Sequence, residues 1–301
     1  MSREQFLNDV ALTPLCLNQK FVYDFIMAKE KMTMEVYEPK YYLVEDVTYA
    51  QVDAWFGNVT RDLRMDIVYP QTTERKCPCI IWICGGGWKQ MNKGAHLPYL
   101  CDLARHGFVV ASVEYRLGHE APFPGALIDI KAAIRYLRAH ADRYSIDSEK
   151  FGAAGESAGG YLTAMTALAN NSEFETGKYL EYSSAVQAAC PWYMPCDIAK
   201  LVNENGLNLP FFAGNMKDEK YQRYINPVNY VTEKAPPFLL LHGTDDALIP
   251  FEHSELIYDA LAAFNIDVKL IGLKGEDHAG LQFFQRPLWD IIAFFFKEKL
   301  G

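Results

Sequence analysis

Short apolar runs alternate with longer segments of helical spacing along most of the chain. Parallel strands need crossover connections and are buried on both faces, so this alternation predicts a mostly parallel sheet flanked by helices. The segment that begins at Ala126 illustrates the helices, because it places Leu127, Ile130 and Ile134 on one face. The apolar runs are CIIWIC from 79, FVVASVEY from 108, AVQAAC from 185, FLLLHG from 238 and VKLIGL from 268.

The rest of the chain fits around one α/β domain over residues 41–301. Two early segments, YYLVEDVTYAQV from 41 and DLRMDIVYP from 62, alternate apolar and polar residues and are predicted to be antiparallel edge strands. Residues 170–237 hold one strand signal and are otherwise irregular and aromatic, which indicates a small lid insertion over one end of the sheet. Residues 1–40 fit no strand, and their helical spacing predicts an N-terminal helical arm.

Charge and cysteine usage exclude several classes of protein. Lys and Arg total 29 against 38 Asp and Glu, a formal net charge of -9, so nucleic acid is not expected as a partner. The 7 cysteines form no CxxC pair and no Cys/His cluster, which indicates reduced thiols and no metal site. The first residues lack an unbroken apolar stretch, and no run is long enough for a membrane span. We therefore expect a cytoplasmic protein that does not bind membranes, and the sequence leaves open whether it forms a homo-oligomer.

The segment FGAAGESAGGYL from 151 contains the pattern G-x-S-x-G around Ser157. The pattern alone is weak, but here an apolar strand precedes the serine and a helical segment follows it. Small residues on both sides permit the sharp turn that lifts a nucleophilic serine out of a sheet. The alternative is a glycine-rich turn without chemistry. The context favours a catalytic nucleophile at Ser157.

A serine nucleophile needs a general base, and the base needs an orienting carboxylate. In the chain order serine, acid, histidine, the base follows the run VKLIGL, where KGEDHAG supplies His278. The acid is expected on the loop HGTDDALIP, and both Asp245 and Asp246 lie there. Spacing does not separate these two aspartates. His242 and His253 flank the same loop and are expected to shape it.

The three glycines at 85–87 follow directly after the run CIIWIC. Acyl transfer passes through a tetrahedral oxyanion, which backbone NH groups stabilise. One donor is the NH of Ala158, directly after the nucleophile, and the others come from a loop after an early strand. Glycine lets that loop turn its NH groups toward a substrate without an intervening side chain.

These residues resemble a known group of enzymes. The loop CGGGW, the segment from VEYRLGHEAPFPG to GESAGGYL, the loop HGTDDALIP and the terminal DHAG are similar to α/β-hydrolase esterases of the hormone-sensitive-lipase-like and Bacteroides feruloyl-esterase-like families. The similarity covers roughly residues 42–298. It implies an eight-stranded α/β-hydrolase sheet with a small lid.

The resemblance also assigns roles to residues. It implies Ser157 as nucleophile, His278 as base and Asp246, rather than Asp245, as acid. It implies oxyanion donors at the NH groups of Gly86, Gly87 and Ala158. The chain departs from the family at Cys84, where histidine is usual before the triple glycine. Because a thiol is a weaker hydrogen-bonding group than imidazole, the way this loop is braced is open, and we expect Cys84 to pack at the strand end.

The resulting hypothesis is a serine carboxylesterase that needs no cofactor and acts on small acyl esters, including acetyl or feruloyl groups on carbohydrates. Five aromatic residues are candidates to line the substrate site or, equally, to pack the lid against the core. Two alternatives remain open: an arylformamidase or other amidase on the same fold, and a non-catalytic binding protein that retains all three triad positions. The five aromatic residues are Trp88, Trp192, Tyr193, Phe211 and Phe212.

Overall fold

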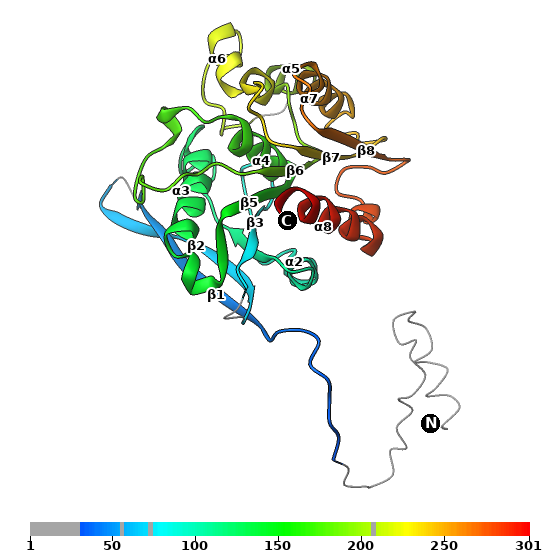
Figure 1. Cartoon of the computed structure of the whole chain (residues 1–301). Coiled ribbons are helices and arrows are strands. Elements are labelled where there is room, and N and C mark those ends of the chain that lie inside the picture. Colours follow the sequence, from blue (N-terminus) through cyan, green and yellow to red (C-terminus); the bar gives the residue numbers. More distant parts are fainter. Residues whose placement is uncertain (1–30, 55–56, 72–74, 206–208) are drawn as a thin grey trace, which may run out of the picture. The chain divides into compact units, whose positions relative to one another are not determined.

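The computed structural model in Figure 1 describes residues 31–54, 57–71, 75–205 and 209–301. The chain divides into two units, Met1–Glu38 and Pro39–Gly301. The described residues of the first unit form no helix or strand, and most of the predicted helical arm over residues 1–40 lies outside the described residues. All helices and strands of the described residues belong to the second unit.

Eight strands of the described residues form one sheet in the order β1-β2-β4-β3-β5-β6-β7-β8. β2 pairs antiparallel with both β1 and β4, and the remaining neighbours pair parallel. The sequence predicted this mixed sheet, including its antiparallel edge. The strands are β1 (Tyr41–Ala54), β2 (Val59–Pro70), β3 (Cys77–Ile83), β4 (Val109–Val113), β5 (Ile146–Glu156), β6 (Ala188–Trp192), β7 (Phe238–Gly243) and β8 (Val268–Leu273).

Helices cover both faces of the sheet, as Figure 1 shows. Buried side chains of α3, α4 and α7 join one apolar core, and those of α2 and α8 join the other. Every residue of β3, β4 and β7 is buried for this reason. The helices are α2 (Leu97–Arg105), α3 (Gly125–Ala139), α4 (Ala158–Leu168), α5 (Ile198–Asn205), α6 (Glu219–Ile225), α7 (Glu252–Ala263) and α8 (Arg286–Leu300).

The predicted insertion over residues 170–237 is divided by β6, which lies inside the sheet between β5 and β7. Residues before β6 run along α3, and residues after it carry α5 and α6. In this second part Phe211 and Phe212 pack on Trp88 of the glycine loop, with ring centroids 5.2 and 4.9 Å apart. The insertion therefore contacts the loop after β3.

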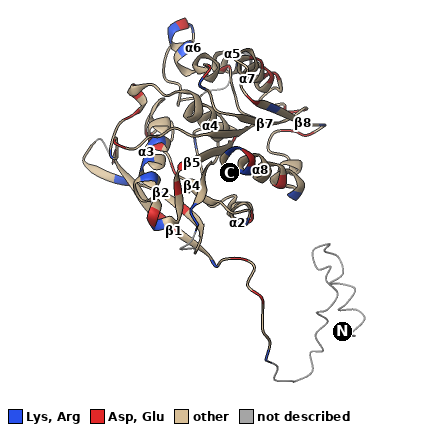
Figure 2. Cartoon of the chain, in the orientation of Figure 1, with Lys and Arg blue, Asp and Glu red and all other residues tan. Residues whose placement is uncertain are grey.

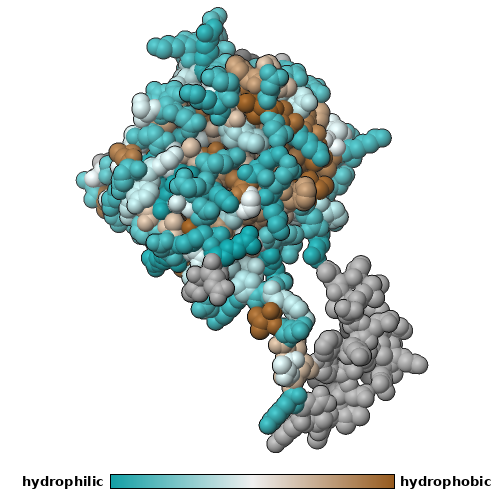
Figure 3. Space-filling model, in the orientation of Figure 1, coloured by the Kyte–Doolittle hydropathy of each residue, from teal (hydrophilic) through white to brown (hydrophobic). Residues whose placement is uncertain are grey.

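Charged residues are spread over the elements, and α3 carries both signs (Figure 2). Figure 3 shows hydrophilic residues over most of the visible face, with apolar groups between them. None of the helices in the described ranges combines the length and the apolar character that a bilayer crossing requires.

Candidate active site

The carboxyl ends of β3, β5, β7 and β8 bring four loops together, because these strands run parallel. Ser157 lies between the end of β5 and the start of α4, with φ 55° and ψ −119°. Few residues other than glycine adopt such a positive φ, so the turn is strained. A Cβ on Gly155 would lie 2.4 Å from the carbonyl oxygen of Ile83, and one on Gly159 only 2.0 Å from it. The small residues of the motif therefore let the turn approach β3.

A continuous hydrogen-bonded chain joins three of these loops. His278 Nε2 lies 2.9 Å from Ser157 Oγ, and His278 Nδ1 lies 2.7 Å from Asp246 Oδ2. Asp246 is buried, whereas its neighbour Asp245 is exposed and receives a hydrogen bond from Thr244 Oγ1. The structure thus places the predicted nucleophile, base and acid within hydrogen-bond distance and brings Asp246 rather than Asp245 to the base.

The surroundings of Asp246 favour its ionised form. Burial alone would raise the pKa of Asp246, but hydrogen bonds involving His242, His278 and the amide of Ile249 outweigh burial and hold this pKa well below the usual value. Asp246 Oδ1 accepts from the amides of Leu248 and Ile249 at 2.9 and 2.7 Å. A carboxylate held in this way keeps the His278 ring oriented.

His242, near the end of β7, contacts the acid loop. Its Nε2 lies 2.8 Å from the carbonyl oxygen of Ile249 and 3.3 Å from Asp246 Oδ2. Both neighbours are acceptors, so Nε2 carries the proton, and Nδ1 faces Ser254 Oγ at 2.7 Å. His253 Nδ1 accepts from the amides of Cys196 and Asp197, each at 3.1 Å. His242 therefore contacts the acid loop, as the sequence predicted, whereas the His253 ring bonds to the segment after β6.

The glycine loop lies beside the nucleophile. Gly86 and Gly87 have φ values of +121° and +62°, and a Cβ on Gly86 would meet the carbonyl oxygen of Gln90 at 2.0 Å. Of the hydrogen bonds between described residues, none is donated by the NH of Gly86, Gly87 or Ala158. These NH groups are the three predicted oxyanion donors.

The loop is braced without the histidine that the family resemblance led us to expect. The amide of Gly85 donates to Glu156 Oε1 at 2.6 Å, and the hydroxyl of Tyr115 donates to the carbonyl oxygen of Cys84 at 2.7 Å. Burial, with the nearby Glu156 carboxylate, raises the pKa of the Cys84 thiol to about 12, so the thiol is neutral. Sequence reasoning missed both braces, although Glu156 occupies the variable position of the nucleophile motif.

The sequence left open whether five aromatic side chains line the substrate site or pack the lid against the core. Trp192 is fully buried, with its ring 5.2 Å from those of both Trp82 and Trp289. Trp88 is 3% exposed and stacks on Phe211. These tryptophans pack the lid and the core and present almost no surface to a substrate.

Tyr193 is also fully buried, but its ring lies 4.7 Å from the His278 imidazole. Its φ is 32°, which is unusual for an aromatic residue. Burial, with the neighbouring Glu156 carboxylate, raises the pKa of Tyr193 well above its usual value. Of the two roles left open for Tyr193, its burial and its contact with His278 favour packing.

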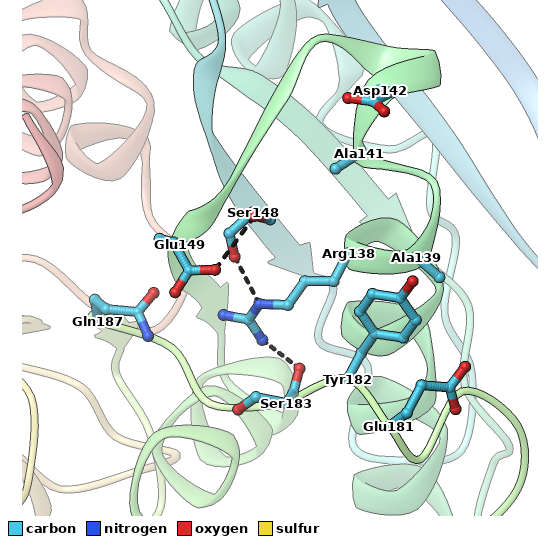
Figure 4. Close-up of a pocket in the computed structure, with 10 residues that line it drawn as sticks. All are labelled: Arg138, Ala139, Ala141, Asp142, Ser148, Glu149, Glu181, Tyr182, Ser183 and Gln187. Carbon is cyan, nitrogen blue, oxygen red and sulfur yellow. Dashed lines mark hydrogen bonds between the residues drawn. The ribbon is translucent and has the colours of Figure 1, made fainter.

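A cavity of about 460 Å³ lies away from this site. It is lined by the end of α3, the start of β5 and the segment before β6, at the opposite end of β5 from Ser157. Figure 4 shows Arg138 crossing this cavity between Ser148 and Ser183. Its Nε donates to the carbonyl oxygen of Ser148 at 2.8 Å, and its other nitrogens donate to the carbonyl oxygens of Ser183 and Ala185. Three of its five N–H groups thus donate to backbone carbonyls of the protein.

The BD-FAE family profile matches residues 65–261, which is more than half of the chain. The chain belongs to the BD-FAE family. The matched region begins in β2 and ends in α7, so it holds Ser157, Asp246 and the glycine loop but not His278.

Curated relatives carry esterase names. A probable carboxylic ester hydrolase LipM of Mycobacterium tuberculosis is 32% identical over 193 residues, which are 61% of this chain and 44% of that protein. A probable isoprenylcysteine alpha-carbonyl methylesterase, ICMEL1, of Arabidopsis thaliana is 24% identical over 80% of this chain and 53% of its own length. The chain spans about half the length of the curated relatives it matches.

Solved structures with the same architecture are also esterases. A truncated carbohydrate esterase from gut microbiota is 26% identical, with a TM-score of 0.72 over 87% of this chain and 99% of that one. Esterase 2 of Thermogutta terrifontis, phosphoramylated by tabun, is 25% identical, with a TM-score of 0.70 over 84% of this chain and 93% of that one. The chain therefore has the α/β-hydrolase fold of these esterases.

Proposed function

We propose that this protein is a serine carboxylesterase that hydrolyses small acyl esters through an acyl-enzyme. The observation that carries this proposal is the position of His278, whose two ring nitrogens meet Ser157 Oγ at 2.9 Å and Asp246 Oδ2 at 2.7 Å. A histidine in that position takes the serine proton while the buried carboxylate stabilises the imidazolium. The esterase names of LipM and of the carbohydrate esterase support the same reaction class.

The proposed first step forms one bond and breaks another. Ser157 Oγ attacks the ester carbonyl carbon as its proton passes to His278 Nε2, which gives a tetrahedral oxyanion. The bond from that carbon to the alcohol oxygen then breaks, and His278 gives its proton to the leaving alcohol. Water repeats the sequence on the acyl-enzyme and releases the acid, so Ser157 is regenerated.

The oxyanion is stabilised by the backbone. The NH groups of Gly86, Gly87 and Ala158 lie in the glycine loop and at the start of α4, and none donates to another described residue. The N-terminus of α4 adds the favourable end of a helix dipole. Such a donor is worth about 3 kcal/mol of transition-state stabilisation.

Three observations bear on the substrate. The name of the carbohydrate esterase from gut microbiota favours an ester on a carbohydrate. The methylesterase name of ICMEL1, in contrast, favours an apolar ester. Leu248 on the acid loop is 44% exposed and Leu281 after the base loop is 80% exposed, so apolar surface lies beside both loops. We propose that one side of the ester is a short acyl or aryl group that contacts these leucines.

The direct test replaces the nucleophile. Ser157→Ala is expected to abolish hydrolysis of p-nitrophenyl acetate, whereas Ser148→Ala, at the opposite end of β5, keeps the rate of the wild type. Circular dichroism and thermal unfolding establish that both variants are folded. Full activity of the Ser157 variant would rule out the proposed nucleophile.

A substrate panel then separates the remaining possibilities. Initial rates are compared on p-nitrophenyl esters of two to about twelve carbons, methyl ferulate, acetylated xylo-oligosaccharides and a prenylcysteine methyl ester. The proposal predicts the highest kcat/KM on the short acyl or feruloyl esters. Faster turnover of N-formylkynurenine than of every ester would instead identify an arylformamidase.

A further inference from the structure

The far end of the glycine loop is fixed by an ion pair outside the triad. Lys93 Nζ lies 2.8 Å from Asp66 Oδ1 and 2.9 Å from Asp46 Oδ1. Asp66 is on β2 and only 3% exposed, whereas Asp46 is on β1 and largely exposed. A buried carboxylate needs a partner, and the partner here comes from the loop that follows β3.

The geometry around Asp66 is built to receive this lysine. The amide of Asp46 donates to Asp66 Oδ1 at 2.9 Å, and Asp46 adopts φ 56° at an irregularity in the pairing of β1 with β2. Burial alone would lower the pKa of Lys93, but hydrogen bonds and charge attraction from Asp66 and Asp46 outweigh burial and raise this pKa. The ammonium therefore stays charged against the edge of the sheet.

Ser112 on β4 connects the two ends of the loop. Its hydroxyl donates to the carbonyl oxygen of Lys93 at 2.7 Å, and its Oγ lies 4.0 Å from Cys84 Sγ at the start of the loop. Between these ends the chain folds back on itself, because the amide of Gln90 donates to the carbonyl oxygen of Gly86 at 3.2 Å. The position of Gly86 thus depends on where Lys93 is held.

We propose that Lys93 and Asp66 are positioning residues that set the NH groups of Gly86 and Gly87 for the oxyanion, an inference that rests on the proposed esterase reaction. Neither side chain touches the substrate. Interactions that strengthen only in the transition state change kcat and leave KM nearly constant. A loop that shifts its amides by about 1 Å can slow such a reaction roughly 100-fold.

The test replaces Lys93 and a matched lysine. Lys93→Met removes the ion pair at the loop. Lys76→Met removes the exposed pair with Asp142, 2.5 Å long, at the other end of β3, and changes the net charge equally. We expect Lys93→Met to lower kcat by about 10- to 100-fold with KM within about threefold of the wild type. Lys76→Met retains the kinetics of the wild type.

Two ketone inhibitors separate positioning from general damage. Ser157 Oγ adds to the carbonyl carbon of 1,1,1-trifluorohexan-2-one as the serine proton passes to His278. The oxyanion that forms accepts hydrogen bonds from the NH groups of Gly86 and Gly87 in this proposal. Hexan-2-one binds without forming this adduct. In Lys93→Met the inhibition constant of the trifluoro ketone is expected to rise by the factor by which kcat falls. The inhibition constant of hexan-2-one is expected to stay constant.

Three results would overturn the inference: an unchanged kcat in Lys93→Met, a loss confined to KM, or equal weakening of both ketones. If Lys93→Met does not fold, Ser112→Ala keeps the ion pair and removes the hydroxyl that holds the Lys93 carbonyl. In Ser112→Ala we expect kcat to fall by about 3- to 10-fold with KM unchanged and with weaker binding of the trifluoro ketone alone. An unchanged kcat in this variant would equally refute the positioning role. An inactive wild type would refute the proposed function, whereas an active wild type with these results refutes only the positioning role.

Discussion

Charged side chains are buried in two regions of the molecule, and the regions differ in where the hydrogen bonds of these side chains lead. Against α3, Lys131 and Arg135 are buried and both pair with Glu175. Every such group there has an acceptor inside the protein, as Arg138 has in the cavity of Figure 4. At the carboxyl ends of the strands, Asp246 is also buried and hydrogen-bonded. Its hydrogen bonds lead through His278 to Ser157, which is partly exposed.

The difference teaches that buried charge and cavity volume alone do not mark the proposed active site. The cavity of about 460 Å³ is crossed by the Arg138 guanidinium, which already donates to three backbone carbonyls. At the proposed active site, the NH groups of Gly86, Gly87 and Ala158 donate to no other described residue. The Ser157 hydroxyl is paired with His278 Nε2 at 2.9 Å. Three backbone donors without a described partner, beside a serine paired with a histidine, distinguish this site from the buried ion pairs against α3.

The largest expected effect is on activity at the catalytic end. Asp246→Asn retains the shape of the side chain but removes the charge that orients and stabilises protonated His278. We expect kcat to fall on the order of 10⁴-fold, measured on p-nitrophenyl acetate. Asp245→Asn is the matched control, because Asp245 is exposed and one residue away. Equal losses in both variants would contradict the assigned acid.

The next effect is on stability at α3. Glu175→Gln leaves the buried cations Lys131 and Arg135 without their anion, and breaking a buried pair costs about 3–5 kcal/mol of unfolding free energy. Urea unfolding measures this loss, and Glu173→Gln, at an exposed glutamate of the same turn, serves as the control. The folded variant should retain kcat/KM. A large fall in kcat/KM with unchanged stability would show that the two regions are not independent.

A smaller, pH-dependent effect is expected at His253, a buried histidine at the start of α7. Burial lowers the pKa of His253 to about 4. The unfolded chain binds this proton below a pKa of about 6.5, so the stabilisation is complete above that pH and is lost as pH falls toward 4. Between about pH 7.5 and about pH 5, the wild type should lose about 2 kcal/mol more stability than His253→Asn.

The asparagine in that variant offers an oxygen to the amides of Cys196 and Asp197 but does not titrate in this range. Urea unfolding of both proteins at the two pH values provides the comparison. Parallel pH profiles would show that His253 is not the titrating group.

The sequence was sufficient to predict those parts of the fold and of the site that depend on local residue patterns. Continuous apolar runs predicted the strands, and the run from 79 overlaps the buried strand β3 at Cys77–Ile83. The run from 268 forms β8 instead, an edge strand in which no residue is buried. The order of motifs predicted which loops meet, because parallel strands end at one edge of the sheet. Spacing left Asp245 and Asp246 equivalent, since the choice depends on which carboxylate the loop turns toward His278. In the structure the amides of Leu248 and Ile249 hold Asp246 in that position.

Features that depend on distant packing were not predictable. Lys131 and Arg135 lie off the apolar face of α3, and nothing local shows that residues around Glu175 cover them. Trp88 and Trp192 are of a residue type that is common in substrate sites, but both are buried as core residues are. The pairing of Lys93 with Asp66 joins residues 27 positions apart, and only the fold brings them together.

The central claim is that Ser157 is the nucleophile, and covalent labelling tests it most directly. Folded wild-type protein is treated with a fluorophosphonate, in which Ser157 Oγ displaces fluoride from phosphorus, and the adduct is located by peptide mass spectrometry. We predict a single adduct on Ser157, formed much more slowly in His278→Ala and absent in Ser157→Ala. Folded wild-type protein that hydrolyses esters yet carries no label on Ser157 would contradict the account.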